Sequence, residues 1–129
     1  MSALDGIREE QPALLRANAI SHRAAATGFD WDDAAGARAK VIEELAEVDA
    51  ATTLAEQTDE IGDLLFALVN WARKLGIEPE GALHQATSKF EGRFRAMEQE
   101  AGAGFPALTL DQMEQLWQAI KGRTPTPIA

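Results

Sequence analysis

The sequence contains no cysteine and no tyrosine, and aromatic residues make up only 6% of its 129 residues. The absence of cysteine excludes a disulfide framework and any thiolate metal site, and it fits a cytoplasmic location. No apolar run approaches the ~18 residues that a membrane helix needs, and residues 1–20 carry no apolar signal-peptide core. We therefore expect neither a membrane span nor a secretion signal.

Basic residues are also scarce, because 12 Lys and Arg stand against 21 Asp and Glu, which gives a net charge of −9. Such a surface argues against binding a nucleic-acid polymer. It leaves a small phosphate ligand possible if metal ions intervene. With 46% apolar residues the chain has the composition of a globular protein. We predict one domain over residues 1–122, followed by a disordered tail at 123–129.

Strand signals are weak, whereas helix start and stop signals are frequent. The predicted fold is all-α: an antiparallel helical bundle of about four to five helices with short connections. The loop "GFDWDD" at 28–33 carries Phe29 and Trp31, which we expect to anchor onto the bundle. The pattern predicts helices at about 12–27, 33–53, 58–75, 79–101 and 109–121.

Four acidic residues form two pairs, each three residues apart: Glu44 with Glu47, and Glu60 with Asp63. This spacing places each pair on one face of a helix. The second pair opens a helix that is apolar around most of its circumference, which is typical of a buried helix. Its one polar stripe also contains Asn70. The apolar positions are Ile61, Leu64, Leu65, Phe66, Leu68, Val69 and Trp71.

Isolated buried carboxylates must be paired, protonated or bound to a metal. The linking segment 48–59 is long enough to bring two helices together antiparallel, so that the four carboxylates face each other. Such an oxygen-rich group suits Mg²⁺ or Mn²⁺. Alternatively, the first pair lies on a solvated helix face. The second pair then lies at the start of a helix, where negative charges interact favourably with the helix dipole. A di-iron site is disfavoured, because neither His22 nor His84 follows a Glu by three residues.

One further residue and two further pairs of residues have two interpretations each. Asn70 either hydrogen-bonds a ligand or is a satisfied core amide. Lys89 and Arg93 flank an apolar stripe on the helix at 79–101, where snorkelling over the core edge is the alternative to ligand binding. Trp117 and Lys121 repeat this spacing on the last helix, where a Trp is more often part of the core. We assign Trp31 and Trp71 to packing, and His22 and His84 to structural positions.

The acidic residues form the pattern Glu43-Glu44-x-x-Glu47, a spacer, then Glu60-x-x-Asp63, which resembles the MazG family of nucleoside triphosphate pyrophosphohydrolases, within the all-α NTP pyrophosphatase superfamily. The likeness extends to "GFDWD", "EIGDLLFALVNWARKLGI", "ALHQATSKFEGRFRAME" and "LDQMEQLWQAIK". These blocks are similar to the C-terminal domain of longer two-domain members. Gly92 departs from the pattern, since close relatives often have Arg there.

The resemblance implies that Glu44, Glu47, Glu60 and Asp63 bind Mg²⁺, with Mn²⁺ as a possible substitute, and act in catalysis. It implies that Lys89 and Arg93 face phosphates and that Trp117 and Lys121 lie near the nucleotide. Glu43 is a further catalytic candidate, for orienting water or holding a second metal ion. Asn70 is added as a substrate-binding candidate because it continues the acidic stripe. The candidate catalytic residues are therefore Glu43, Glu44, Glu47, Glu60 and Asp63, and the candidate substrate-binding residues are Asn70, Lys89, Arg93, Trp117 and Lys121.

The resemblance further implies Mg²⁺-dependent hydrolysis of a nucleoside triphosphate to the monophosphate and pyrophosphate, as house-cleaning of nucleotide pools. It also implies a MazG-like homodimer or homotetramer. Two other functions stay open. One is a related dUTP- or phosphoribosyl-ATP-type pyrophosphohydrolase, and the other is a non-catalytic acidic helical module that binds a partner protein.

Overall fold

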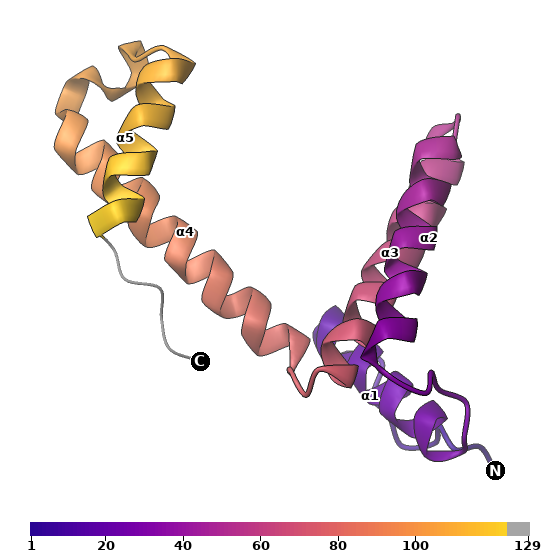
Figure 1. Cartoon of the computed structure of the whole chain (residues 1–129). Helices are drawn as coiled ribbons and strands as arrows, with labels where there is room; N and C mark the ends of the chain where they lie inside the picture. The colour runs from indigo at the N-terminus through magenta and orange to yellow at the C-terminus, as the bar shows by residue number, and fades with distance from the viewer. Residues whose placement is uncertain (124–129) are drawn as a thin grey trace. The chain divides into compact units, whose positions relative to one another are not determined.

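A computed structural model describes residues 1–123, and among these residues all regular structure is helical (Figure 1). The all-α prediction is therefore confirmed. Arg123, which we assigned to the tail, belongs to the last helix, and the rest of the predicted tail lies outside the described residues. The elements are α1 (Ala13–Ala26), α2 (Ala34–Ala50), α3 (Leu54–Lys74), α4 (Pro79–Ala101), the 3₁₀-helix η1 (Gly102–Ala107) and α5 (Leu110–Arg123).

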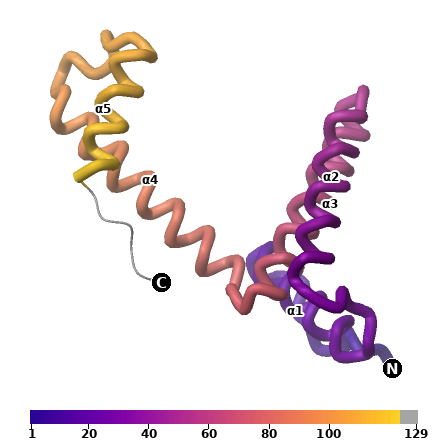
Figure 2. Tube along the Cα trace, in the orientation of Figure 1, coloured from indigo at the N-terminus to yellow at the C-terminus, as the bar shows by residue number. Residues whose placement is uncertain are grey.

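The chain divides into two compact units, and the first comprises residues 1–82. Its main contact is between α2 and α3, which lie side by side (Figures 1 and 2). Only residues 51–53 separate these two helices, so they run antiparallel. The helix α1 packs against α3. Small residues allow this close packing, since Ala37 on α2 and Ala67 on α3 are both buried.

Side-chain caps define the starts of α2 and α3. The Asp33 carboxylate accepts a hydrogen bond from the Gly36 backbone N–H at 2.9 Å, and the Thr53 hydroxyl accepts one from Glu56 N–H at 3.1 Å. These bonds satisfy backbone donors that the first turn leaves free. The Thr53 cap corrects our prediction that the third helix begins near Thr58. Gly76 ends α3 as predicted, with a φ of 77° that glycine adopts without steric cost.

Ion pairs hold the loop between α1 and α2 against the end of α3. Asp30 Oδ1 lies 2.6 Å from Arg73 Nη2, and Asp30 Oδ2 lies 3.2 Å from Lys74 Nζ. Hydrogen bonding to Arg73, with a smaller contribution from Lys74, holds the pKa of the Asp30 carboxyl well below its ordinary value of 3.8. Lys74 also donates to the Trp31 carbonyl oxygen at 2.8 Å. The position of Trp31 is therefore fixed by α3.

The second unit begins at Leu83 and contains the rest of α4 together with η1 and α5. The sequence pattern of Thr109 followed three residues later by Gln112 predicts a capping box at the start of the last helix, and the structure confirms it with reciprocal hydrogen bonds of 2.9 and 3.1 Å. Aromatic contacts join its elements: the ring centroids of Phe90 and Trp117 lie 5.3 Å apart, and those of Phe94 and Phe105 lie 5.4 Å apart, edge to face.

The expectation that the third helix is buried on nearly all sides is wrong. Ile61 is 43% exposed, Leu65 49% and Leu68 39%, whereas Val69 is buried. The reason is that α2 and α1 cover only part of the α3 surface within the first unit. Phe29 is 84% exposed. The prediction that Phe29 anchors onto the bundle is therefore wrong. No helix within residues 1–123 is both long and apolar enough to cross a membrane.

Candidate functional site

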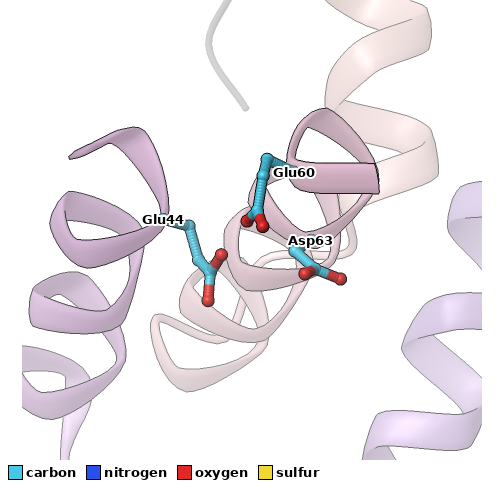
Figure 3. Close-up of side chains that lie close together, drawn as sticks. All are labelled: Glu44, Glu60 and Asp63. Carbon is cyan, nitrogen blue, oxygen red and sulfur yellow. The ribbon is translucent and has the colours of Figure 1, made fainter. Parts of the chain in front are cut away.

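Three of the predicted acidic residues come together where α2 faces α3 (Figure 3). Glu44 belongs to α2, and Glu60 and Asp63 belong to α3. Each contributes a carboxylate oxygen, and these three oxygens all lie within 4.8 Å of one another. Glu44 is buried, Glu60 is half-buried and Asp63 is exposed. The (i, i+3) spacing thus places Glu60 and Asp63 on one face of α3, as predicted.

Mutual repulsion is evident in the electrostatics of Glu60. Desolvation, followed by the negative charges of Asp63, Glu47, Asp59 and Glu44, raises the pKa of the Glu60 carboxyl above its ordinary value of 4.5. Glu47 is exposed and stands outside the three-oxygen group, although its charge acts on Glu60. The predicted set of four acids is therefore observed as three close carboxylates and one neighbour.

The donor set fits a hard divalent cation. Mg²⁺–oxygen distances of about 2.1 Å place opposite oxygens of an octahedron roughly 4.2 Å apart. Neighbouring octahedral oxygens lie closer, at roughly 3.0 Å. The three carboxylate oxygens, which lie within 4.8 Å of one another, would therefore move closer together to become ligands of one ion. The group contains no nitrogen or sulfur donor, which favours Mg²⁺ or Mn²⁺ over softer metals. The acidic group is compatible with a divalent metal ion.

Lys40 is a residue of the site that the sequence reasoning missed. Its Nζ lies 3.0 Å from Glu44 Oε1 and 3.3 Å from Glu43 Oε1. Hydrogen bonding first to Glu44 and then to Glu43 raises the pKa of Lys40 above its ordinary 10.5. The (i, i+3) and (i, i+4) spacing of Lys40 with Glu43 and Glu44 could have predicted these ion pairs, because residues at these spacings are neighbours on a helix surface. Glu43 itself points outward, with 61% of its side chain exposed.

A cavity of about 250 Å³ opens beside the acidic group. Its polar side carries Lys40, Glu44 and Asp63, and its apolar side carries aromatic and aliphatic atoms. Trp31, which we assigned to packing, forms part of this wall. The complete lining is Trp31, Lys40, Glu44, Asp63, Phe66, Ala67 and Asn70. Such a combination of apolar wall and convergent charges is typical of small-molecule sites.

Asn70 lines this cavity but uses its amide within the protein. Its Oδ1 accepts hydrogen bonds from the Ser21 hydroxyl and from Arg73 Nη2, the latter at 3.2 Å. Its Nδ2 donates to the Phe66 carbonyl oxygen at 3.1 Å. These bonds match the core-amide interpretation and link α1 to α3. The bond to the Phe66 carbonyl oxygen also connects Asn70 to another residue that lines the cavity.

The predicted phosphate- and nucleotide-facing residues all belong to the second unit. Arg93 is buried, and its guanidinium carbon lies 5.8 Å from the centroid of the Trp117 ring. Within the described part of the chain, its Nε has no hydrogen-bond partner. Lys89 is half-buried and Lys121 is exposed. The structure thus brings Arg93 and Trp117 together.

The fold and this site define a class: an all-α protein with a candidate divalent-cation centre formed by two antiparallel helices. Comparison with known families gives a more specific assignment. The sequence profile of the phosphoribosyl-ATP pyrophosphohydrolase family matches residues 16–89, which include all three close acids. The chain belongs to this family.

Curated relatives confirm the MazG likeness. The chain is 44% identical over 128 residues to the nucleoside triphosphate pyrophosphohydrolase of Escherichia coli (strain K12), covering 93% of this chain and 49% of that protein. It is 40% identical over 118 residues to the nucleoside triphosphate pyrophosphohydrolase/pyrophosphatase MazG of Thermotoga maritima, covering 89% and 46%. A 65-residue match to YabN of Bacillus subtilis is 45% identical and covers 48% and 13%. The chain spans about half the length of the first two relatives.

Proposed function

We propose that this chain hydrolyses ribo- or deoxyribonucleoside triphosphates to the nucleoside monophosphate and pyrophosphate, with Mg²⁺ as cofactor and Mn²⁺ as a substitute. The observation that carries this proposal is the group of Glu44, Glu60 and Asp63 oxygens within a chain of a pyrophosphohydrolase family. The Escherichia coli and Thermotoga maritima relatives are both named nucleoside triphosphate pyrophosphohydrolases, which supports the substrate class.

Glu44, Glu60 and Asp63 would hold the metal ion, with Glu47 as the fourth ligand. When bound, Mg²⁺ offsets the charge of phosphate oxygens and lowers the pKa of an attacking water. In the reaction, the water oxygen bonds to phosphorus, the phosphoanhydride bond between the α- and β-phosphates breaks, and the water protons pass to the products or solvent. Glu43 is the candidate for orienting that water or for holding a second metal ion.

Each unit by itself carries candidate substrate-binding side chains. Trp31 and Phe66 offer the cavity an apolar wall on which a base can stack, and Asn70 supports that wall. Lys89 and Arg93 would bind phosphate oxygens and stabilise the charge that moves toward the leaving group. Trp117 and Lys121, also in the second unit, are the further nucleotide-binding candidates that the MazG resemblance implies.

Three further properties belong to this proposal. The exposed apolar side chains Ile61, Leu65 and Leu68 on α3 support a homodimer or homotetramer, because contiguous exposed apolar surface is typical of interfaces. The net charge of −9 argues against a nucleic-acid polymer as the partner and leaves a small nucleotide possible where a metal ion intervenes. We place the protein in the cytoplasm, where it would clear unwanted nucleotides from the pool.

A nucleotide panel tests the proposal. The purified chain is incubated with Mg²⁺ and each ribo- and deoxynucleoside triphosphate, and pyrophosphate release is measured, with Asp63→Asn as the matched control. Phosphoribosyl-ATP and dUTP belong in the panel, the first because the matching family profile is named for it. Pyrophosphate release from triphosphates by the wild type but not by Asp63→Asn supports the proposal. Absence of pyrophosphate from every substrate would favour the non-catalytic binding module.

A further inference from the structure

The acidic group already has a cation of its own. Lys40 stands one helical turn before Glu44 on α2, and its ammonium nitrogen lies 3.0 Å from Glu44 Oε1. We propose that Lys40 is a tethered competitor for the metal. Its ammonium pairs with the Glu44 carboxylate in the metal-free protein, and this pairing lowers the affinity of the centre for a divalent ion. This inference rests on the proposed function, because it concerns the same metal centre.

The geometry makes Glu44 the shared partner of both cations. The Glu44 side chain is only 10% exposed, so little water is available to solvate its charge. Its carboxylate contacts Lys40 and also contributes an oxygen to the group formed with Glu60 and Asp63. Lys40 also lines the cavity beside that group. A divalent ion that binds there must share or take over the Glu44 carboxylate.

The charges give the sign of the effect. Three carboxylates with oxygens within 4.8 Å of one another repel strongly in the metal-free protein, and one ammonium offsets part of that repulsion. Lys40 therefore stabilises the metal-free state. The same positive charge repels an incoming divalent ion and holds one of its ligands, so it lowers the affinity of the metal-bound state. Both effects predict tighter metal binding when the ammonium is removed.

Glu43 supplies an alternative partner for the displaced ammonium. Its Oε1 lies 3.3 Å from Lys40 Nζ, and its side chain is 61% exposed. Lys40 can therefore leave Glu44 and stay paired with Glu43 without entering another environment. Removing the Glu43 charge should confine Lys40 to Glu44 and weaken metal binding. This effect should shrink when Lys40 itself is absent, because no ammonium then needs a second partner.

Two simpler roles for Lys40 make different predictions. If Lys40 serves to hold Glu44 in its metal-binding rotamer, its removal should weaken metal binding. If the contact is an ordinary surface ion pair, which typically contributes at most about 1 kcal/mol, its removal should leave metal binding unchanged. The sign of the change in metal affinity therefore separates the three roles.

The test is direct titration with Mn²⁺ alone, in which electron paramagnetic resonance counts the free ion. Lys40→Met keeps the aliphatic stem and removes the charge, and Lys40→Arg keeps the charge. Arg38→Met is the matched control: it removes one positive charge from an exposed position on the same helix, about 200° around the axis from Lys40. We expect Lys40→Met to bind Mn²⁺ about three- to tenfold more tightly, while Lys40→Arg and Arg38→Met stay near the wild type.

Glu43→Gln completes a double-mutant cycle with Lys40→Met. We expect Glu43→Gln to weaken Mn²⁺ binding in the wild-type background and to do so less in the Lys40→Met background. Unchanged or weaker binding by Lys40→Met overturns the tethered-competitor role while leaving the proposed function intact. If neither the wild type nor Lys40→Met binds Mn²⁺, both proposals fail. If only Lys40→Met binds it, competition by Lys40 is stronger than expected and the inference is supported.

Discussion

Divalent metal should stabilise the first unit, and a double substitution of its acidic group should abolish that effect. The three carboxylate oxygens lie within 4.8 Å of one another, and the surrounding negative charges contribute to raising the pKa of Glu60. A bound cation would remove this repulsion in the folded state only, because the group does not exist in the unfolded chain. Glu60→Gln/Asp63→Asn keeps the side-chain shapes and removes two of the three charges.

The size of the effect follows from ligand linkage. A ligand at a hundred times its dissociation constant adds about 2.7 kcal/mol to the free energy of unfolding. For a chain of this size, about 1 kcal/mol corresponds to roughly 3–5 °C in melting temperature. Saturating Mg²⁺ should therefore raise the melting temperature of the wild type by about 8–13 °C relative to EDTA. The double variant should melt in EDTA at or above the wild-type temperature and gain nothing from Mg²⁺.

Tryptophan fluorescence can follow the first unit by itself. Trp31 and Trp71 belong to it, whereas Trp117 belongs to the second unit, so the melts use a Trp117→Phe background. KCl at equal ionic strength controls for general screening. Asp111→Asn/Glu114→Gln is the control variant, because it makes the same change in net charge at exposed positions of α5. Its melting temperature should still rise in Mg²⁺ as that of the wild type does. Equal wild-type melting temperatures in EDTA and Mg²⁺, or a full shift in the acidic-group variant, would refute this reasoning.

Four other predictions concern single residues. In EDTA, the melting temperature should rise as pH falls from 7 through the raised pKa of Glu60, because protonation removes a repelled charge. Asp30, whose pKa is lowered, stays ionised over this pH range. Glu60→Gln should flatten the dependence of the melting temperature on pH. Asp30→Asn should lower the free energy of unfolding by about 2–3 kcal/mol in denaturant titrations, since Arg73 is only 8% exposed and loses its carboxylate; no change would contradict this. Gly92→Ala should stabilise α4 by about 0.5–1 kcal/mol, measured by Trp117 fluorescence, because no neighbouring atom lies within 4 Å of an added Cβ. Lys89→Met should lower kcat/KM by roughly tenfold to a hundredfold with an unchanged melting temperature, and wild-type kinetics would place the phosphate site elsewhere.

Local sequence signals predicted much of the fold and the core of the site. The Thr109–Gln112 pair and Gly76 mark helix ends through their own backbone and side-chain geometry, so no distant contact is needed to interpret them. The three-residue spacing of Glu60 and Asp63 fixes a shared face in the same way. The meeting of α3 with Glu44 on α2 was predictable because only a short link joins the two helices.

Properties that depend on tertiary contacts were predicted less well. An apolar circumference does not specify which neighbours cover it, so the exposure of Ile61 and Leu65 was missed. Trp31 was assigned to packing because its place in the cavity wall depends on Lys74 and on the loop conformation. The start of α3 was placed too late because Asp59 and Thr58 are also plausible caps, whereas the structure uses Thr53.

The central claim is that the acidic group supports hydrolysis between the α- and β-phosphates, and ³¹P NMR of the products tests it most directly. A nucleoside triphosphate is incubated with Mg²⁺ and either the wild type or Asp63→Asn, and the phosphorus signals are followed over time. The account predicts nucleoside monophosphate and pyrophosphate in equal amounts from the wild type and almost no turnover by the variant. Formation of nucleoside diphosphate and phosphate, or equal turnover by Asp63→Asn, would contradict it.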